Sequence, residues 1–509
     1  MLKWTLPLAA LLATAGLAPA QAAGNVTMAF DNNVLGLNPA NLNDNLSMSA
    51  SRTIMQGLFG FDKDMKLHPL LAESYEANDN ATVFTIHLRK GITFSDGTPF
   101  NAAAVKTSFD FMRDPANHLK RLSLYAPIDK IETPDDSTVK ITLKQPFGPF
   151  IANLAHIAFA VMSPKAIAEY GKDLDRHAVG TGPFMLDSWQ TDTLKVVKNP
   201  HYWQPGLPKV DSLTIKSVPE DGTRISMLQA GEAQFIFPVP PGMAQSLEHN
   251  AKFDLIHKPS IYARYVAMNV LKKPFDDVRV REALNYAVNK DALLKVVFNG
   301  YGQKLDSALP SGLAGYSSQG GAWPYDPAKA KKLLAEAGYP NGFSTVLWGN
   351  SASLTRKAMV FLQQQLGAVG VKVEVEPLEA GVMISRIYGV QKPEEAQTQL
   401  YYGGWSASTG DADWELRPLL SKMGFPPTLY NTGYYSNPKV DADVQGALET
   451  ADAAKRAAFY KDAQAQIWKD APWIFLVSEN ILYARVKNLS GIDVMPDGQT
   501  LTLDAAFTK

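Results

Sequence analysis

The sequence predicts an α/β protein that is divided into two or three domains. Its 509 residues exceed the length at which a single hydrophobic core keeps growing. Strand-like and helix-like patterns alternate in residues 213–237, and they alternate again in residues 327–405. This alternation is typical of a sheet covered by helices, so we expect an α/β fold in both halves of the chain.

The first segment, residues 1–22, predicts a cleavable secretory signal. It has Lys3 near its start, an apolar run over 6–17 and small residues at 20–22. A membrane anchor is the alternative, but the apolar run is too short to span a bilayer and contains Pro7 and Gly16. We therefore exclude this segment from the fold and expect an exported protein.

The first half of the remaining chain shows the pattern of a core with an insertion. Alternating or helical periodicity predicts strand 26–30, helix 49–58, strand 83–88, helix 102–111 capped by Asn101, strand 139–143, an extended segment over 179–189, strand 213–215, helix 223–228 and strand 234–237. We expect 46–178 to form an inserted subdomain.

The second half has an α/β pattern of its own and predicts a parallel sheet. The expected elements are strand 264–270, helices 277–287, 291–298 and 327–337, strand 344–347, helix 354–369, strand 371–375, helix 381–388, a strand that ends at Trp405, helix 455–469 and strand 473–477.

Composition excludes several classes of function. The 49 basic residues and 50 acidic residues leave a net charge of −1, whereas nucleic acids and anionic membranes select for basic proteins. The chain has no Cys, so disulfides and thiolate nucleophiles are excluded. Its eight His residues lack metal-ligand spacing, and we expect no metal, cofactor or catalytic site.

The stretch 404–414 concentrates the chemistry of the chain just after a predicted strand. It contains Trp405, the hydroxyls of Ser406 and Ser408, and the carboxylates of Asp411 and Asp413. A loop at a strand end is a common place for a binding site because the strand holds it rigidly. We expect this stretch to contact a ligand; the alternative is a surface turn with capping residues.

Several motifs resemble one known family. The segments are 57–60, 71–75, 91–97, 179–184, 202–203, 273–287 and 324–327, and they are similar to the peptide and nickel class of extracellular solute-binding proteins. The resemblance implies a type II periplasmic binding protein of the large, three-domain, peptide-binding variety, with the ligand cleft between two lobes. One lobe would combine 24–45, 179–262 and 480–509 with the insertion 46–178, and the second lobe would be 263–479.

Within that family, segments 114–121, 202–209 and 404–414 are similar to the members that bind glutathione. This resemblance implies a monomeric, non-catalytic periplasmic receptor of an ABC importer. It would close its lobes on glutathione, or on a closely similar short peptide, and deliver it to a membrane permease. The alternatives are a general di- or oligopeptide receptor, a haem or metal-chelate receptor, and a secreted hydrolase that uses Asp411 and Asp413.

The resemblance also implies roles for cationic and polar residues. Arg356 stands where dipeptide-binding relatives hold the ligand carboxylate, and Arg264 is a second candidate for this role or else a surface ion pair. Asn33 and Thr181 are further expected ligand contacts.

Position 408 departs from the dipeptide-binding pattern. Those relatives use an Asp to bind the ligand ammonium four residues after the Gly of Gly-Trp, and here that position is Ser408. This leaves Asp411 or Asp413 as the expected anion, unless both are helix N-caps. Trp405 would form an apolar wall of the site, or pack in the core instead.

Overall fold

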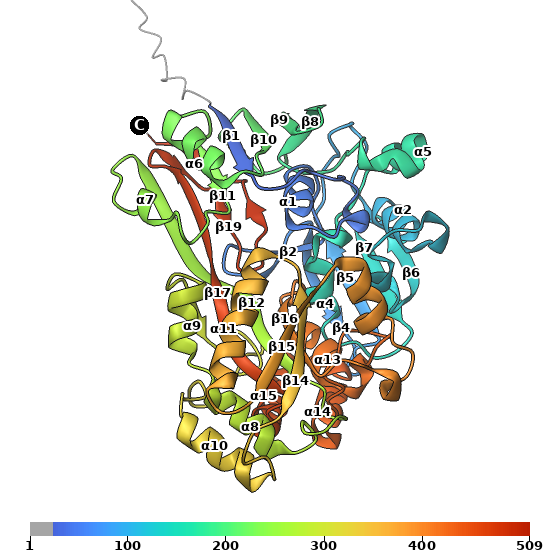
Figure 1. The fold of residues 1–509 in the computed structure, drawn as a ribbon. Helices are drawn as coiled ribbons and strands as arrows, with labels where there is room; N and C mark the ends of the chain where they lie inside the picture. Colours follow the sequence, from blue (N-terminus) through green and yellow to red (C-terminus); the bar gives the residue numbers. More distant parts are fainter. Residues whose placement is uncertain (1–23, 509) are drawn as a thin grey trace, which may run out of the picture.

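The structure is a computed structural model that describes residues 24–508. The predicted secretory signal, 1–22, lies outside the described residues. The predicted α/β class is confirmed: helices surround a large mixed sheet, and smaller sheets lie beside it (Figure 1).

The main sheet has 11 strands and extends through the whole molecule. Its order is β15-β14-β16-β12-β17-β11-β1-β10-β9-β8, and β13 pairs with β17. The strands are β1 (Asn25–Phe30), β8 (Phe184–Trp189), β9 (Thr193–Lys198), β10 (Ser212–Ser217), β11 (Phe235–Phe237), β12 (Phe253–Met268), β13 (Gly302–Lys304), β14 (Ser344–Asn350), β15 (Lys372–Leu378), β16 (Leu400–Ser406) and β17 (Trp473–Val486).

Figure 1 shows an upper part of the molecule, which contains β1 and α1 (Asn45–Ile54), and a lower part, which contains α8 (Val278–Ala287) and α10 (Pro327–Glu336). Strands β12 and β17 connect these two parts. Both are longer than the predicted strands 264–270 and 473–477. The two strands pair from Phe253 to Ala267, with a register shift between Pro259 and Ala263. Proline has no N–H to donate, and a shift in the ladder accommodates it.

The expectation of a parallel sheet in the second half was only partly correct. Strand β14 does pair in parallel with β15 and β16. Strand β12, however, pairs antiparallel with both β16 and β17. Strand β12 enters the second half directly from the upper part of the molecule. Its direction therefore does not result from a helical crossover within the second half.

A separate four-stranded antiparallel sheet lies in the segment 46–178, in the order β4-β5-β7-β6. The strands and helices of this segment, together with α1, are α1 (Asn45–Ile54), β2 (Phe59–Phe61), β3 (Leu67–Pro69), β4 (Ala72–Ala77), β5 (Val83–Leu88), α2 (Ala102–Arg113), α3 (Leu122–Tyr125), β6 (Ile128–Asp135), β7 (Thr138–Leu143), α4 (Phe150–Ala155) and α5 (Pro164–Tyr170).

Capping residues explain where two helices of this part begin. Asn101 accepts a hydrogen bond from Ala104 N at 2.9 Å, which confirms its predicted role at the start of α2. Helix α1 begins four residues before the predicted helix 49–58, because Asp44 accepts from Ser47 N at 2.8 Å. The sequence pattern located this helix by its apolar residues and overlooked the cap.

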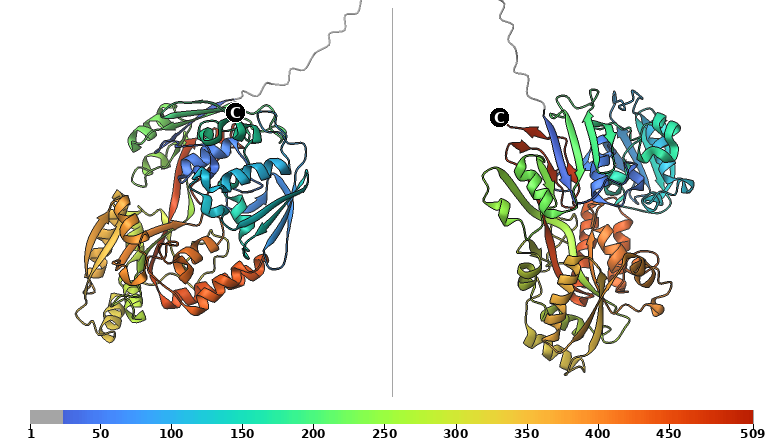
Figure 2. Two further views of the ribbon diagram at one scale, coloured as in Figure 1. Left: turned by 90° about the vertical axis from the view of Figure 1, so that its right-hand side faces the viewer. Right: turned by 45° about the horizontal axis from the view of Figure 1, so that its top comes forward.

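The remaining helices lie mainly around the lower part, where several cover the sheet (Figures 1 and 2). They are α6 (Asp221–Ala230), α7 (Gln245–Glu248), α8 (Val278–Ala287), α9 (Lys290–Val297), α10 (Pro327–Glu336), α11 (Ser353–Gly367), α12 (Ala380–Met383), α13 (Asp413–Leu420), α14 (Pro438–Leu448) and α15 (Ala453–Asp470). Four short strands end the chain: β18 (Leu489–Ser490), β19 (Asp493–Val494), β20 (Thr500–Leu501) and β21 (Ala506–Phe507).

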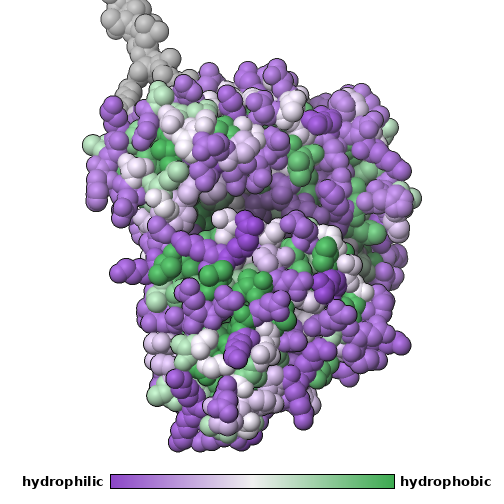
Figure 3. All heavy atoms as spheres, viewed as in Figure 1, coloured by the Kyte–Doolittle hydropathy of each residue, from purple (hydrophilic) through white to green (hydrophobic). Residues whose placement is uncertain are grey.

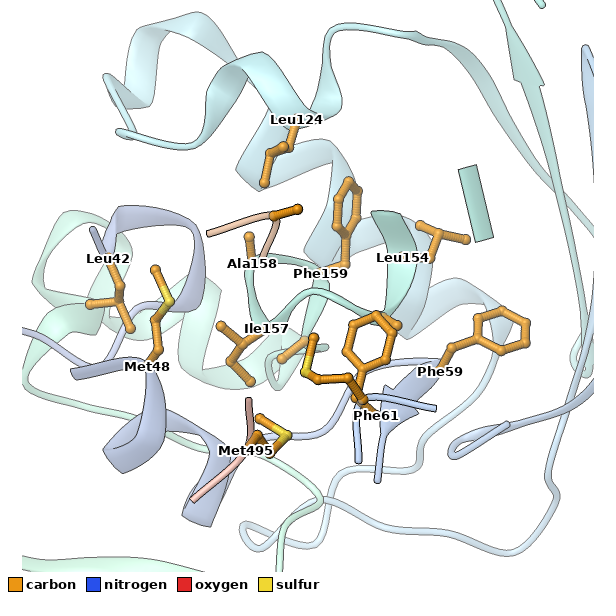
Figure 4. Close-up of a cluster of buried hydrophobic side chains, with 14 of the residues drawn as sticks. Leu42, Met48, Phe59, Phe61, Leu124, Leu154, Ile157, Ala158, Phe159 and Met495 are labelled. Carbon is orange, nitrogen blue, oxygen red and sulfur yellow. The ribbon is translucent and has the colours of Figure 1, made fainter. Parts of the chain in front are cut away.

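The largest cluster of buried apolar side chains fills the upper part and continues into α13–α15. Figure 4 shows a portion of it, to which Phe59, Phe61, Ile157 and Phe159 belong together with Met495 from the end of the chain. Segments far apart in sequence are thus held in one core. Within residues 24–508, none of the helices combines the length and the apolar character that a membrane span requires.

Candidate ligand-binding site

The two strands that connect the halves of the molecule border a cavity. Where their pairing shifts, Ser260 Oγ donates to Glu479 O at 2.6 Å and Ser478 Oγ donates to Ser260 O at 2.8 Å. A cavity of about 270 Å³ lies here, and we call it the crossover cavity. It is lined by Asn45 and Asp497 from the upper part, by Tyr262 and Glu479 on the connecting strands, and by Leu354 from the lower part.

The surface of the molecule is hollowed between its upper and lower parts, and mainly hydrophilic side chains surround the hollow (Figure 3). Because residues from both parts also line the crossover cavity, a molecule bound there would touch both parts at once. This geometry suits a ligand that is gripped between two bodies.

Arg264 has a partner within the protein. Its Nη2 donates to Glu479 Oε1 at 3.0 Å, and its guanidinium lies 4.4 Å from the ring centre of Tyr262. The side chains of Arg264 and Glu479 are 14% and 23% exposed, so this is a half-buried pair rather than the surface ion pair considered from the sequence. Its charge is largely balanced, and a direct role in holding a ligand carboxylate stays a prediction.

Gly404 makes room for this arrangement. Strand β16 places Gly404 opposite Arg264 and Ser406 opposite Tyr262. A Cβ atom at position 404 would lie 2.3 Å from Tyr262 Cε1 and 2.8 Å from Arg264 Nη1. The Gly of the Gly-Trp pair is therefore needed so that Tyr262 and Arg264 can lie across β16.

Trp405 forms part of an aromatic surface. Its Nε1 donates to Trp414 O at 2.6 Å, and its ring centre lies 5.2 Å from that of Tyr430. Tyr388 packs edge-on against Tyr430 at 5.7 Å and shares a hydrogen bond of 2.8 Å with the hydroxyl of Tyr401. The sequence analysis identified Trp405 but missed Tyr388 and Tyr430, because only tertiary packing brings these separate segments together.

The two serines of this loop differ in their surroundings. Ser406 Oγ is buried and has no hydrogen-bond partner among the described residues. Ser408 is half-buried, and its backbone N donates to Ser406 O at 2.9 Å. An unpaired buried hydroxyl costs stability, so Ser406 is suited to bonding with a bound molecule.

Asp411 and Asp413 have their bonding partners within the second half of the chain. Asp411 Oδ1 accepts from Tyr460 Oη at 2.7 Å and from Asp413 N at 2.9 Å. Asp413 binds Arg417 through both carboxylate oxygens, at 2.8 and 2.7 Å. Burial raises the pKa of Asp411, although the nearby Arg456 opposes this shift. These internal partners occupy the oxygens that we expected to meet a ligand ammonium.

Neither acid is the N-cap of helix α13, because that position is Ala412. Helix α13 begins at Asp413, and Asp411 accepts the backbone N–H of that residue. Asp411 thus satisfies a free donor at the helix start. The N-capping expected of Asp413 is wrong, because Asp413 is the first residue of the helix, and Asp411 lies one residue before the N-cap.

The other predicted ligand residues are spread widely. Arg356 is exposed on the first turn of α11, beside Leu354 of the crossover cavity, and has no ion pair within the described residues. Asn33 is exposed in the loop after β1. Thr181 is 1% exposed and donates to Gln56 Oε1 at 3.2 Å inside the upper part. Arg356 is not among the residues that line the crossover cavity, and the Thr181 hydroxyl is used internally.

Glu479 is a charged residue of the cavity that the sequence analysis missed. Only its Oε1 has a partner among the described residues, which is Arg264. The sequence carried no sign of its role, since the strand 473–477 was expected to end before it. Across residues 24–508, no three His, Cys, Asp or Glu side chains form a group that could hold a metal ion.

A family model and individual proteins of known name both match this chain over most of its length. Residues 66–426 match the model of the bacterial extracellular solute-binding proteins, family 5. A glutathione-binding protein, GsiB, of Escherichia coli (strain K12) is 51% identical over 478 residues, which cover 94% of this chain and 93% of that protein. The protein of the same name from Pectobacterium atrosepticum is 49% identical over 493 residues and 96% of each chain.

Solved structures share the fold. HbpA2 from Haemophilus parasuis has a TM-score of 0.87 at 27% identity, covering 96% of this chain and 100% of that one. The periplasmic binding protein DppA of Helicobacter pylori, in complex with the peptide STSA, has a TM-score of 0.78 at 28% identity, covering 96% and 98%.

Proposed function

The chain belongs to the bacterial extracellular solute-binding proteins of family 5, and from this premise we propose that it is the periplasmic receptor of an ABC importer for glutathione. A closely similar short peptide is included in the proposal. The observation that carries it is the 51% identity, over 94% of the chain, to proteins named for glutathione binding. The receptor binds its ligand without changing it and delivers it to a membrane permease.

In this proposal the molecule works as two lobes. The first comprises 24–45, 179–262 and 480–509 with the insertion 46–178, and the second comprises 263–479. The shift in pairing between Pro259 and Ala263 supports this division, since it lies on the strands that connect the two parts. Rotation about these strands closes the lobes over the crossover cavity.

The crossover cavity and its surroundings fit the groups of glutathione. The ligand carries two carboxylates, an ammonium, two amides and a thiol. Arg356 and the first turn of α11 bind one carboxylate, because Arg356 has no internal ion pair and N–H groups at a helix start attract anions. Trp405 lies against the apolar part of the ligand, and Ser406 and Ser408 bond to its amides.

The ligand ammonium needs an anion, and Glu479 supplies it. This side chain lines the crossover cavity, and its Oε2 has no partner among the described residues. A carboxylate that serves Arg264 with one oxygen can accept from an ammonium with the other. Glu479 thus takes the place of the Asp that dipeptide-binding relatives have at position 408.

Mass spectrometry of the molecule released from the protein tests this proposal. The protein is purified from the periplasm of cells that express the full chain and is then denatured. We expect intact glutathione in the released fraction, and none from a sample treated with guanidinium and refolded. Recovery of haem, of longer peptides or of a cleaved product would contradict it, and failure to recover the protein from the periplasm would contradict the secretory role of 1–22.

A further inference from the structure

The insertion 46–178 touches the segment 263–479 far from the two connecting strands. Gly148 N donates to Leu448 O at 2.7 Å, at the end of helix α14. A Cβ atom at position 148 would lie only 2.0 Å from Thr450 O and 2.8 Å from Ala447 O. Only a residue without a side chain allows this approach, which we call the rim contact (Figure 2, left view).

Two arginines of the second segment lie at the rim contact. The Arg417 guanidinium lies 5.7 Å from the ring centre of Phe147. Arg456 Cδ would be 3.0 Å from a Cβ atom at position 148, and its Nη1 donates to Ala451 O at 2.8 Å. Both arginines therefore meet residues 147–148 of the insertion.

Each arginine is also paired with an aspartate of the loop that carries Trp405. Arg417 binds both oxygens of Asp413, and Arg456 Nη2 lies 3.8 Å from Asp411 Oδ2. The side chains of these four residues are between 3% and 18% exposed. Two ion pairs thus connect the rim contact to the loop 404–414.

The rim contact lies beside a cavity. The cavity has a volume of about 430 Å³ and is lined by Phe61, Gly148, Gly410, Asp411 and Arg456. Ile151 and Ala152 of helix α4 face this cavity from the insertion. This cavity leaves room beside the contact for the side chains of Asp411 and Arg456 to move.

We propose that the pairs Asp411–Arg456 and Asp413–Arg417 are positioning residues that couple the rim contact to the ligand loop. When Phe147 and Gly148 meet the two arginines, the aspartates hold the loop 404–414 in the shape that presents Trp405 and Ser406. A ligand bound to this loop stabilises the rim contact in return, because coupling between two sites is reciprocal. This inference rests on the proposed function only for the identity of the ligand.

The substitution Gly148→Val tests the coupling, and Gly367→Val is its matched control. Gly367 ends helix α11, is exposed, and has no atom within 4 Å of an added Cβ. Without ligand, we expect small-angle scattering to give a larger radius of gyration for Gly148→Val than for the control. Calorimetry should show glutathione affinity reduced about tenfold in Gly148→Val and unchanged in the control.

A second variant keeps the test decisive if Gly148→Val alters the fold. Arg417→Met keeps most of the side-chain volume but removes the link between Phe147 and Asp413. We expect Arg417→Met to lower the affinity for glutathione. The double variant, which carries both Arg417→Met and Gly148→Val, should lose no more affinity than the more strongly affected single variant. Equal radii and affinities for Gly148→Val and its control, or fully additive losses, would overturn the inference. Absence of glutathione binding by the unaltered protein would contradict only the proposed function, since the ligand-free radii still test the coupling.

Discussion

Asp413 binds Arg417 through both of its carboxylate oxygens, at 2.8 and 2.7 Å, one turn apart on helix α13. The pair is largely buried, with side-chain exposures of 3% and 18%. Removing one member of such a pair leaves the other charge without compensation, whereas a well-formed pair itself contributes little net stability. This pair serves mainly to fix the position of the loop before it.

Asp413→Asn should therefore destabilise the protein by about 3 kcal/mol, because Arg417 keeps its charge in a site with little solvent. Urea unfolding measures this change. Asp110→Asn is the control, since Asp110 forms comparable helix-surface pairs with Lys106 and Arg113 at 36% exposure. The control should lose about 0.5 kcal/mol or less. Similar losses in both variants would contradict the structural role of the Asp413 pair.

Gly404→Ala should weaken ligand binding. The added methyl group would overlap Tyr262 and Arg264, so that their stacked arrangement across β16 must shift. We expect about tenfold lower affinity for glutathione by calorimetry, with a stability loss of about 1–3 kcal/mol. Gly367→Ala supplies the control in open space. Unchanged affinity in Gly404→Ala would show that Tyr262 and Arg264 do not shape the site.

Glu415 predicts a pH dependence of stability. It is 0% exposed, both carboxyl oxygens lack hydrogen-bond partners within residues 24–508, and burial raises its pKa well above the ordinary value of 4.5. Above this ordinary value the unfolded chain releases a proton that the folded protein retains, so Glu415 lowers stability as pH rises. Below it, both states are protonated and the effect disappears.

Glu415→Gln removes this titration. Its stability relative to the unaltered protein should increase between about pH 4 and about pH 8, as measured by urea unfolding at both values. Taking the difference between the two proteins at each pH cancels the other titrating groups. A difference that stays constant with pH, or one that decreases, would mean that Glu415 is not held protonated.

Ser408→Asp should shift ligand preference towards ordinary dipeptides. A carboxylate placed beside Trp405 supplies the anion for an α-ammonium that dipeptide-binding relatives have at this position, and charge-assisted hydrogen bonds of this kind are strong. Calorimetric titration with glutathione and with dialanine measures the ratio of affinities. Ser408→Asn has the same shape without the charge and should leave the ratio unchanged. An equal ratio in both variants would contradict the role of this position.

Local patterns were sufficient to predict much of the fold. Strand 83–88 matches β5, and Asn101 caps α2, because alternation and capping depend on neighbours in sequence. Two glycines of the predicted extended segment 179–189 allow close backbone approach: a Cβ atom at Gly180 or Gly182 would lie 2.4 Å from the backbone of Ile54. The lengths of β12 and β17 were missed, because pairing between distant segments carries these strands past Pro259.

The candidate site was less accessible from the sequence. The pattern identified the loop 404–414 correctly as a dense group of polar and aromatic residues. It did not show that Asp411 pairs with Arg456 and that Asp413 pairs with Arg417. Both arginines lie on helices, and tertiary packing determines which way those helices present their side chains. Glu479 and Tyr430 join the site from segments whose positions only the folded chain defines.

The most direct test of the central claim is a calorimetric titration of the unaltered protein, from residue 24 onward, with glutathione and with dialanine. The account predicts one glutathione bound per chain, with an affinity at least about tenfold higher than that for dialanine. Tighter binding of dialanine, or the absence of heat with glutathione, would contradict it.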